Sequence, residues 1–70
     1  MMPLTFAKTG ETVQVKNILG KPEVKQHLAE LGFVANENIT LINITGGNMI
    51  LQVKEGRVAL GRDMASKIMI

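Results

Sequence analysis

The sequence predicts a mainly β fold, a small and partly open barrel of about five short strands with one short α-helix. Short runs of alternating or β-branched residues recur along the chain, and glycine- or asparagine-containing turns separate them. Only one segment, residues 22–31, has apolar residues at helical spacing. A flat sheet of this size would leave its edge strands unpaired, and curling into a barrel removes most of that exposed edge.

The length and composition indicate one domain, residues 1–70, with a core that stabilises the fold only narrowly. The chain has no cysteine, so neither a disulfide nor a thiolate zinc site can hold it together. No stretch reaches the ~18 apolar residues that a spanning helix needs, and the N-terminus shows no signal-peptide pattern. We therefore expect a cytoplasmic protein without direct membrane insertion.

The first strand is expected at residues 12–16, where polar and apolar side chains alternate after a turn at residues 9–11. Pro22 fits the first turn of the helix that follows, because its missing N–H is not needed there. The apolar stripe of this helix consists of Val24, Leu28 and Leu31.

Gly32 is expected to end the helix in the motif HLAELGF. A glycine supplies the left-handed conformation just past the last turn, and the next residue then folds back, so Phe33 should pack near Leu28. On these local grounds, Gly32→Ala should cost ~1 kcal/mol of stability.

The second half of the chain reads as strands joined by tight turns. Residues 39–44 are rich in β-branched side chains and should form a strand, but the sequence does not decide which of its two faces points to the core. Ile39 and Leu41 share one face of this strand, and Ile42 and Ile44 share the other.

A hairpin turn at residues 45–48 leads to a return strand, and a tight turn at residues 55–56 leads to another at residues 57–60. Residues 61–66 are too short for a real helix, and we expect Asp63 to cap a single turn there through its carboxylate. The side chains expected to point inward from these strands and from a last short strand are Met49, Leu51, Val53, Val58, Leu60, Ile68 and Ile70.

Catalysis is not expected, and no cofactor is implied. Ser66 and His27 are the only serine and histidine, and no third residue of obvious role completes a triad. The glycine pair at residues 46–47 lacks the following lysine of a phosphate-binding loop, so it reads as a hairpin turn.

Metal binding has one weak set of candidates, Glu23, His27 and Glu30, which lie along one flank of the helix. Carboxylate and imidazole ligands suit Fe(II), Mn(II) or Zn(II). The three residues span two turns of a short helix, and Glu23 with His27 is also an ordinary surface pair. A solvated flank is therefore favoured over a specific site.

Partner binding would rest on apolar side chains that strand alternation turns outward. Ile50 faces out if its two apolar neighbours in the strand fill the core, and Met69 faces out by the same logic. Ile42 joins them in one of the two possible phases of its strand. We expect these three residues to be partner contacts, with the alternative that the twist of the barrel or the helix covers them.

A nucleic-acid partner is not expected. Eight basic residues face six acidic ones, for a net charge of +2, and they are scattered. Phe6 and Phe33 are the only aromatic residues, which leaves little to stack on bases. Clustering of Lys54, Arg57 and Arg62 would favour this class instead.

In this order and spacing, the segments resemble the ferrous iron transport protein A family (FeoA), whose members have an SH3-like barrel. The resemblance covers nearly the whole chain, from TGETVQVKNI and HLAELGF through ANENITLINI and GGNMILQVKEGRVALG to DMASKIMI. Many members have Pro-Gly in the turn after the helix, where this chain has Ala35 and Asn36. Asparagine tolerates the left-handed conformation, so the turn should survive with some loss of rigidity.

The resemblance implies a non-enzymatic cytoplasmic accessory protein of ferrous iron uptake. Such a protein would bind and regulate FeoB, a membrane transporter with a cytosolic GTP-binding part, through protein–protein contacts. A related domain also stands at the end of metal-dependent repressors. The alternative is therefore a stand-alone SH3-like regulatory module with weak transition metal ion binding, although this chain has no helix-turn-helix segment.

Overall fold

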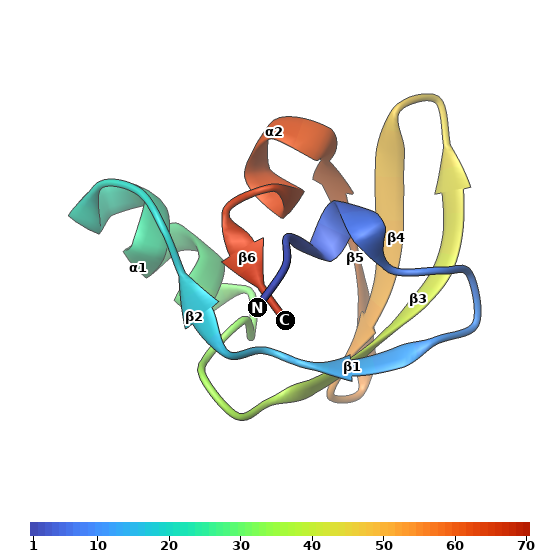
Figure 1. The fold of residues 1–70 in the computed structure, drawn as a ribbon, viewed down its shortest axis with the longest axis horizontal. Coiled ribbons are helices and arrows are strands. Elements are labelled where there is room, and N and C mark those ends of the chain that lie inside the picture. Colours follow the sequence, from blue (N-terminus) through green and yellow to red (C-terminus); the bar gives the residue numbers. More distant parts are fainter.

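The computed structural model describes residues 1–70 and contains six strands in two antiparallel sheets (Figure 1). The larger sheet has the order β1-β3-β4-β5 and the smaller pairs β2 with β6, and the two do not join into a closed ring. The elements are η1 (Leu4–Phe6), β1 (Thr12–Gln14), β2 (Asn17–Ile18), α1 (Pro22–Glu30), β3 (Asn38–Thr45), β4 (Asn48–Val53), β5 (Gly56–Gly61), α2 (Arg62–Ala65) and β6 (Ile68–Met69). The predicted mainly β fold is confirmed, with β2 as a strand that was not expected.

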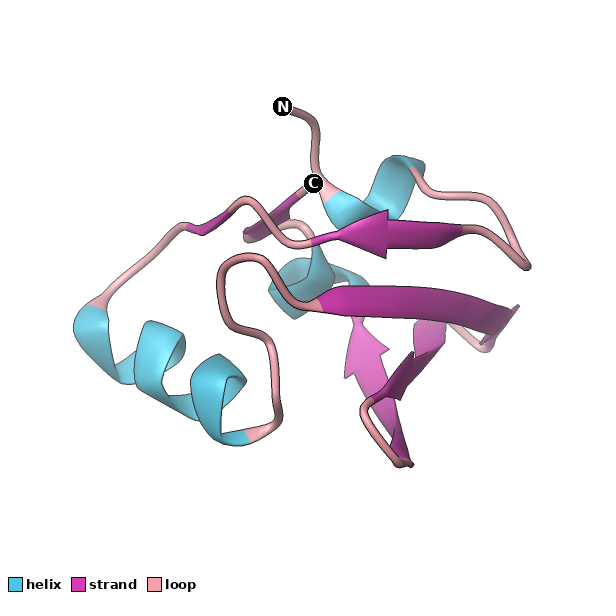
Figure 2. Ribbon diagram, turned by 90° about the horizontal axis from the view of Figure 1, so that it is seen from below, coloured by secondary structure: helices cyan, strands magenta, loops and turns pink.

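Strand β6 lies between β2 and the N-terminal segment, so the two ends of the chain meet (Figures 1 and 2). The backbone N–H of Met2 donates to the carbonyl oxygen of Ile70 at 3.0 Å, and Ile70 returns a hydrogen bond to Met2 at 2.8 Å. On the other edge, the N–H of Leu19 donates to the carbonyl oxygen of Lys67 at 2.7 Å. Segments from both ends and from residues 16–19 therefore form one side of the molecule.

The core is entirely apolar and contains 13 buried residues. Strand alternation explains most of it, because side chains two residues apart point to the same face of a sheet. The inward positions expected in β4 are confirmed, and those expected in β5 and near β6 are buried or packed against the core. The core residues are Leu4, Ala7, Val15, Leu28, Phe33, Ile39, Leu41, Met49, Leu51, Val53, Leu60, Ala65 and Ile68.

A bulge in β3 resolves the phase that the sequence left open. Ile39 and Leu41 are buried, and the register with β4 then shifts between Leu41 and Asn43. Ile42 is the extra residue at this shift and is half-buried. A bulge inserts one unpaired residue and bends its strand. Beyond it, Ile44 is 37% exposed.

The end of α1 has the predicted geometry. The N–H of Phe33 donates to the carbonyl oxygen of Leu28 at 2.9 Å. The N–H of Gly32 donates to the carbonyl oxygen of Ala29 at 3.0 Å. Gly32 has φ +106°, which is the left-handed residue that this motif requires. Phe33 and Leu28 are both fully buried and belong to the same core cluster, which agrees with the packing predicted for the helix end.

Two non-glycine residues adopt positive φ, and one of them corrects a predicted turn. Asn36 has φ +75°, as expected for the turn after α1. Lys54 has φ +55°, and the turn between β4 and β5 consists of Lys54 and Glu55 rather than residues 55–56. The pairing of Val53 with Gly56 causes this shift, because it leaves only two residues to connect the strands.

The expected cap at Asp63 is wrong. Gly61 occupies the N-cap position of α2, and no side chain caps this helix. Asp63 lies inside the first turn, where its carboxylate is no longer at the capping position. Its carbonyl oxygen instead accepts a hydrogen bond from the hydroxyl of Ser66 at 2.7 Å.

Candidate functional site

The outward face of the larger sheet carries two of the three expected contact residues. Ile50 of β4 lies opposite Asn43 of β3 and Ala59 of β5, so it has the phase opposite to the buried Met49. Ile42 stands at the bulge one residue before Asn43. Both isoleucines are half-buried, and neither packs against the core cluster. They are available for contact, and their role in binding stays a prediction.

Met69 belongs to the other sheet. It is half-buried and lies in register with Asn17 of β2 on one side and Pro3 on the other. The structure therefore brings Ile42 and Ile50 together on one sheet and places Met69 on a different one. The three residues do not form a single row, and any common surface would have to extend across two sheets.

The metal candidates Glu23, His27 and Glu30 are all exposed on α1. An α-helix rises ~1.5 Å per residue, so the first and the last of them lie about 10 Å apart along the axis. The structure contains no group of three or more histidine, cysteine or acidic side chains positioned to hold a metal ion. The helix thus presents these residues on successive turns rather than around a common point.

The basic residues named for nucleic acid are also separated. Lys54 lies in the turn before β5 and Arg57 near the start of that strand, while Arg62 follows its far end. Five residues of strand between Arg57 and Arg62 correspond to about 17 Å. These three side chains do not form one patch.

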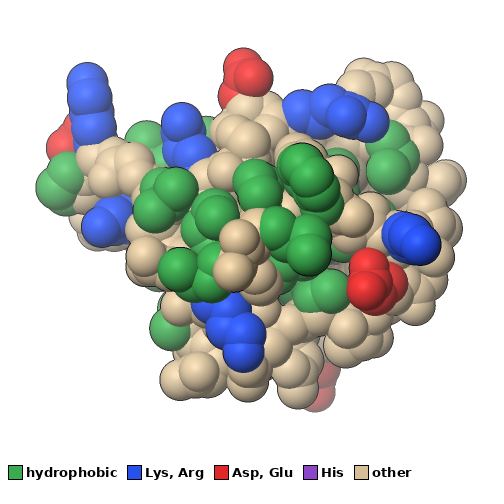
Figure 3. Space-filling view, viewed as in Figure 1, with side chains coloured by type: hydrophobic (Ala, Val, Ile, Leu, Met, Phe, Trp, Pro, Cys, Tyr) green, Lys and Arg blue, Asp and Glu red, His purple; other side chains and the backbone are tan.

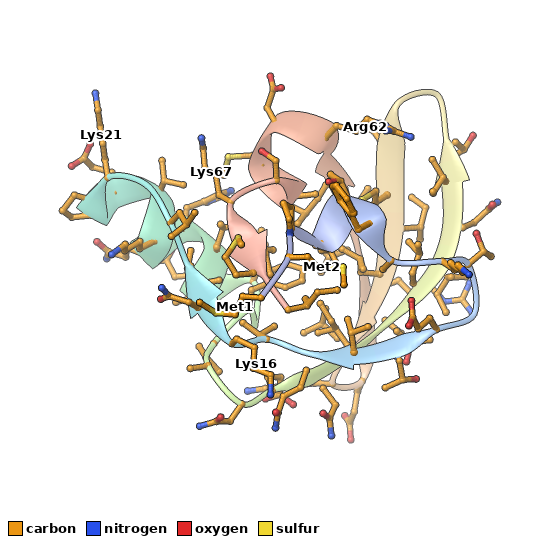
Figure 4. The ribbon with its side chains drawn as sticks, viewed as in Figure 1. Met1, Met2, Lys16, Lys21, Arg62 and Lys67 are labelled. Carbon is orange, nitrogen blue, oxygen red and sulfur yellow. The ribbon has the colours of Figure 1, made fainter.

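Sequence reasoning missed a surface that we call the terminal face, formed by the N-terminal segment with η1, by residues 16–21 and by α2 and β6. Green apolar side chains gather at its centre in Figure 3. Figure 4 shows Met1 and Met2 there, with Lys16, Lys21, Arg62 and Lys67 spread around them. The exposed fractions are 81% for Met1, 68% for Phe6, 49% for Met2 and 46% for Leu19.

No single stretch of sequence predicts the terminal face. Its parts come from three separate stretches of the chain, and the pairing of β6 with both β2 and the N-terminal segment brings them together. The one local signal is Phe6, an aromatic residue in a segment without apolar periodicity. The protein has no enclosed pocket, and none of its helices has the length and apolar character needed to cross a bilayer.

Comparison with known proteins gives the chain a family. Residues 2–70 match the family model of the FeoA domain. The chain is 37% identical over 70 residues to a protein of Methanocaldococcus jannaschii named as an Fe(2+) transport protein A, and the match covers 100% of this chain and 85% of that protein.

Solved structures share the fold. The zinc complex of Stenotrophomonas maltophilia FeoA, described as a procaryotic SH3-domain protein, superposes with a TM-score of 0.84 at 23% identity, covering 99% of this chain and 88% of that one. A manganese-dependent transcriptional repressor superposes with a TM-score of 0.85 at 20% identity, covering 94% of this chain and 38% of the repressor. The fold is therefore SH3-like, and with the match over residues 2–70 the chain belongs to the FeoA family.

Proposed function

We propose that this protein is a non-enzymatic cytoplasmic accessory protein of ferrous iron uptake, which binds and regulates the transporter FeoB through protein–protein contacts. The observation that carries the proposal is the family match over residues 2–70, supported by similarity over 70 residues to a relative named for Fe(2+) transport. A small rigid scaffold with apolar side chains on its outside suits such a role, because protein interfaces place apolar residues at their centre and polar residues around them.

The contact surface that we propose for the transporter is the outward face of β3 and β4. Ile50 lies near its centre, with Ile42 beside it at the bulge and Asn43 opposite. An apolar side chain that is half-buried in the free protein can become fully buried in a complex, which favours association. Met69 is a separate contact that the other sheet would contribute.

The test compares two variants that place a negative charge at almost the same point. Ile50→Glu removes the apolar contact. Asn43→Asp introduces a charge directly opposite and keeps the side-chain oxygen that accepts the N–H of Ile44 at 2.8 Å. Pull-down with the cytosolic part of FeoB should be weakened strongly by Ile50→Glu and less by Asn43→Asp, which adds a charge to the same face but keeps the apolar side chain of Ile50, while the melting temperature of both stays close to that of the wild type.

Cells provide the second measurement. Deletion of the gene should lower Fe(2+) uptake, and the wild-type chain should restore it while Ile50→Glu should not. Normal uptake in the deletion strain would contradict the transport role as a whole. Normal uptake with a folded Ile50→Glu variant would remove only the proposed contact face, and unfolding of that variant would show that Ile50 belongs to the core.

The alternative function is a stand-alone regulatory module with weak transition metal ion binding. Its support is the fold shared with a manganese-dependent repressor, and at 20% identity this likeness extends to the fold alone. Unchanged Fe(2+) uptake in the deletion strain, together with metal-dependent changes in transcript levels, would favour this function over the first.

A further inference from the structure

The apolar part of the terminal face consists of large side chains that the fold leaves in solvent. Met1, Met2, Phe6 and Leu19 are each 46% or more exposed. The residues that flank β6 join two of these segments, because Ile70 hydrogen-bonds to Met2 on one edge and Lys67 accepts the N–H of Leu19 on the other. Isolated exposed apolar residues need no explanation, but a group of this size on one face marks an interaction surface.

The charged part of the same face is mainly basic. Lys16, Lys21, Arg62 and Lys67 stand at separate points around the methionines in Figure 4. Acidic side chains are also present: α2 contributes the exposed Asp63, and Figure 3 shows a red group to the right of the apolar centre. The aliphatic chain of Lys67 lies beside the loop before α1, since a Cβ added at Gly20 would meet its Cδ at 3.4 Å. Its ammonium group is thereby directed outward beyond an apolar stem.

We propose that the terminal face adsorbs reversibly to an anionic lipid bilayer. Methionine, phenylalanine and leucine side chains would enter the headgroup region, and the surrounding cations would pair with lipid phosphates. No segment crosses the bilayer in this arrangement. The inference goes beyond the proposed function, because adsorption requires lipid only and no transporter.

The distribution of charge favours a bilayer over an acidic polypeptide. Arg62 lies in α2, and Lys16, Lys21 and Lys67 lie in three different loops, so the four cations are spread around the apolar centre. A single acidic segment lying across the face would reach some of them and leave others unpaired. An anionic surface carries delocalised negative charge and reaches all of them at once, and each basic side chain held near it strengthens binding about fivefold.

The experiment is co-sedimentation of the purified full chain with vesicles of phosphatidylcholine alone or mixed with phosphatidylglycerol. We expect binding to the mixed vesicles at low ionic strength and little binding to phosphatidylcholine. Salt should release the protein, because the screening length falls from ~10 Å at 0.1 M to ~3 Å at 1 M.

Matched variants locate the surface. Lys16→Glu with Lys21→Glu changes two exposed residues of the terminal face and should lower the partition coefficient at least about 25-fold. Lys54→Glu with Arg57→Glu makes the same change in net charge at the β4–β5 hairpin, which lies away from the chain termini in Figure 2, and should retain binding. Phe6→Ser should weaken binding about fivefold, and Phe6→Leu should restore most of it.

Absence of binding to anionic vesicles at low salt would overturn the inference, including the case in which the face binds only the transporter polypeptide. Equal loss in the two charge-reversed pairs would also overturn it, because net charge rather than this face would then control binding. Melting curves of all variants serve as the folding control. A failure of vesicle binding leaves the uptake and pull-down results of the proposed function unaffected.

Discussion

Replacing Gly32 by alanine should destabilise the protein more than its backbone conformation alone implies. Gly32 has φ +106°, where an L side chain is strained, and a Cβ at this position would stand 2.6 Å from Cγ1 of Val53. Val53 is 4% exposed and belongs to the core, so it cannot swing into solvent. The substitution therefore adds a packing clash to the conformational strain.

The two contributions can be estimated separately. An alanine forced into the left-handed region costs about 1 kcal/mol, and forcing a methyl group into a packed core costs about 1–3 kcal/mol. The expected loss is about 2–4 kcal/mol. For a domain of this size, 1 kcal/mol corresponds to about 4–8 °C, so the melting temperature should fall by about 8–32 °C.

Gly10 provides the matched control. It has φ +87°, and a Cβ there would meet nothing within 4 Å. Gly10→Ala should therefore show only the conformational cost, about 1 kcal/mol. Urea unfolding followed by circular dichroism measures both variants, and Gly32→Ala combined with Val53→Ala should lose less than the sum of the two single changes. If Gly32→Ala is no worse than Gly10→Ala, the clash with Val53 does not control stability.

The remaining predictions concern the core, α2 and metal. Leu28→Ala should lower the free energy of unfolding by about 2–5 kcal/mol, because Leu28 is fully buried and leaves a cavity; a loss below 1 kcal/mol would place it outside the core. Asp63→Ala should change stability by less than about 0.5 kcal/mol, since its side chain does not cap α2, whereas a true cap would cost about 0.5–2 kcal/mol. Calorimetry with Fe(2+) or Zn(2+) should detect no tight stoichiometric site, and a site that disappears in His27→Ala would contradict this.

Local features of the fold could be predicted from the sequence. The helix and its end depend on hydrogen bonds between residues at most five apart, so HLAELGF contains nearly all the information needed. The cost of changing Gly32 could not be predicted in the same way. It arises from Val53, which lies 21 positions further along the chain and approaches only after the barrel has formed.

Features that depend on pairing between distant strands were the ones missed. The bulge at Ile42 depends on how β3 and β4 align along their whole length, and apolar periodicity does not place an extra residue. The turn at Lys54 follows from the register of β4 with β5, although glycine next to it suggested another position. Leu4, fully buried, lies in a segment too short to show any period.

The candidate surfaces also differ in whether they depend on local sequence or on pairing between distant strands. The outward position of Ile50 could be predicted, because strict alternation holds through β4, where Met49 and Leu51 are buried on either side of it. The terminal face could not, because its apolar and basic residues come from separate segments that only the pairing of β6 unites. A charge count of the whole chain also hides it, since a net charge of +2 does not show where the cations lie.

The two proposed surfaces are compatible apart from Met69, because different sheets carry their main residues; Met69 lies in β6 and so belongs to the terminal face as well. Ile50 lies on the outward face of the larger sheet, whereas the terminal face is built around β6 and its neighbours. The chain could therefore contact a bilayer through one surface while the other remains free for a polypeptide. Adsorption would confine the protein to the layer in which the cytosolic part of a membrane transporter also lies, and so raise the effective concentration of one for the other. A modest protein–protein contact would then suffice for regulation, which agrees with two isoleucines that are half-buried rather than a large exposed apolar interface.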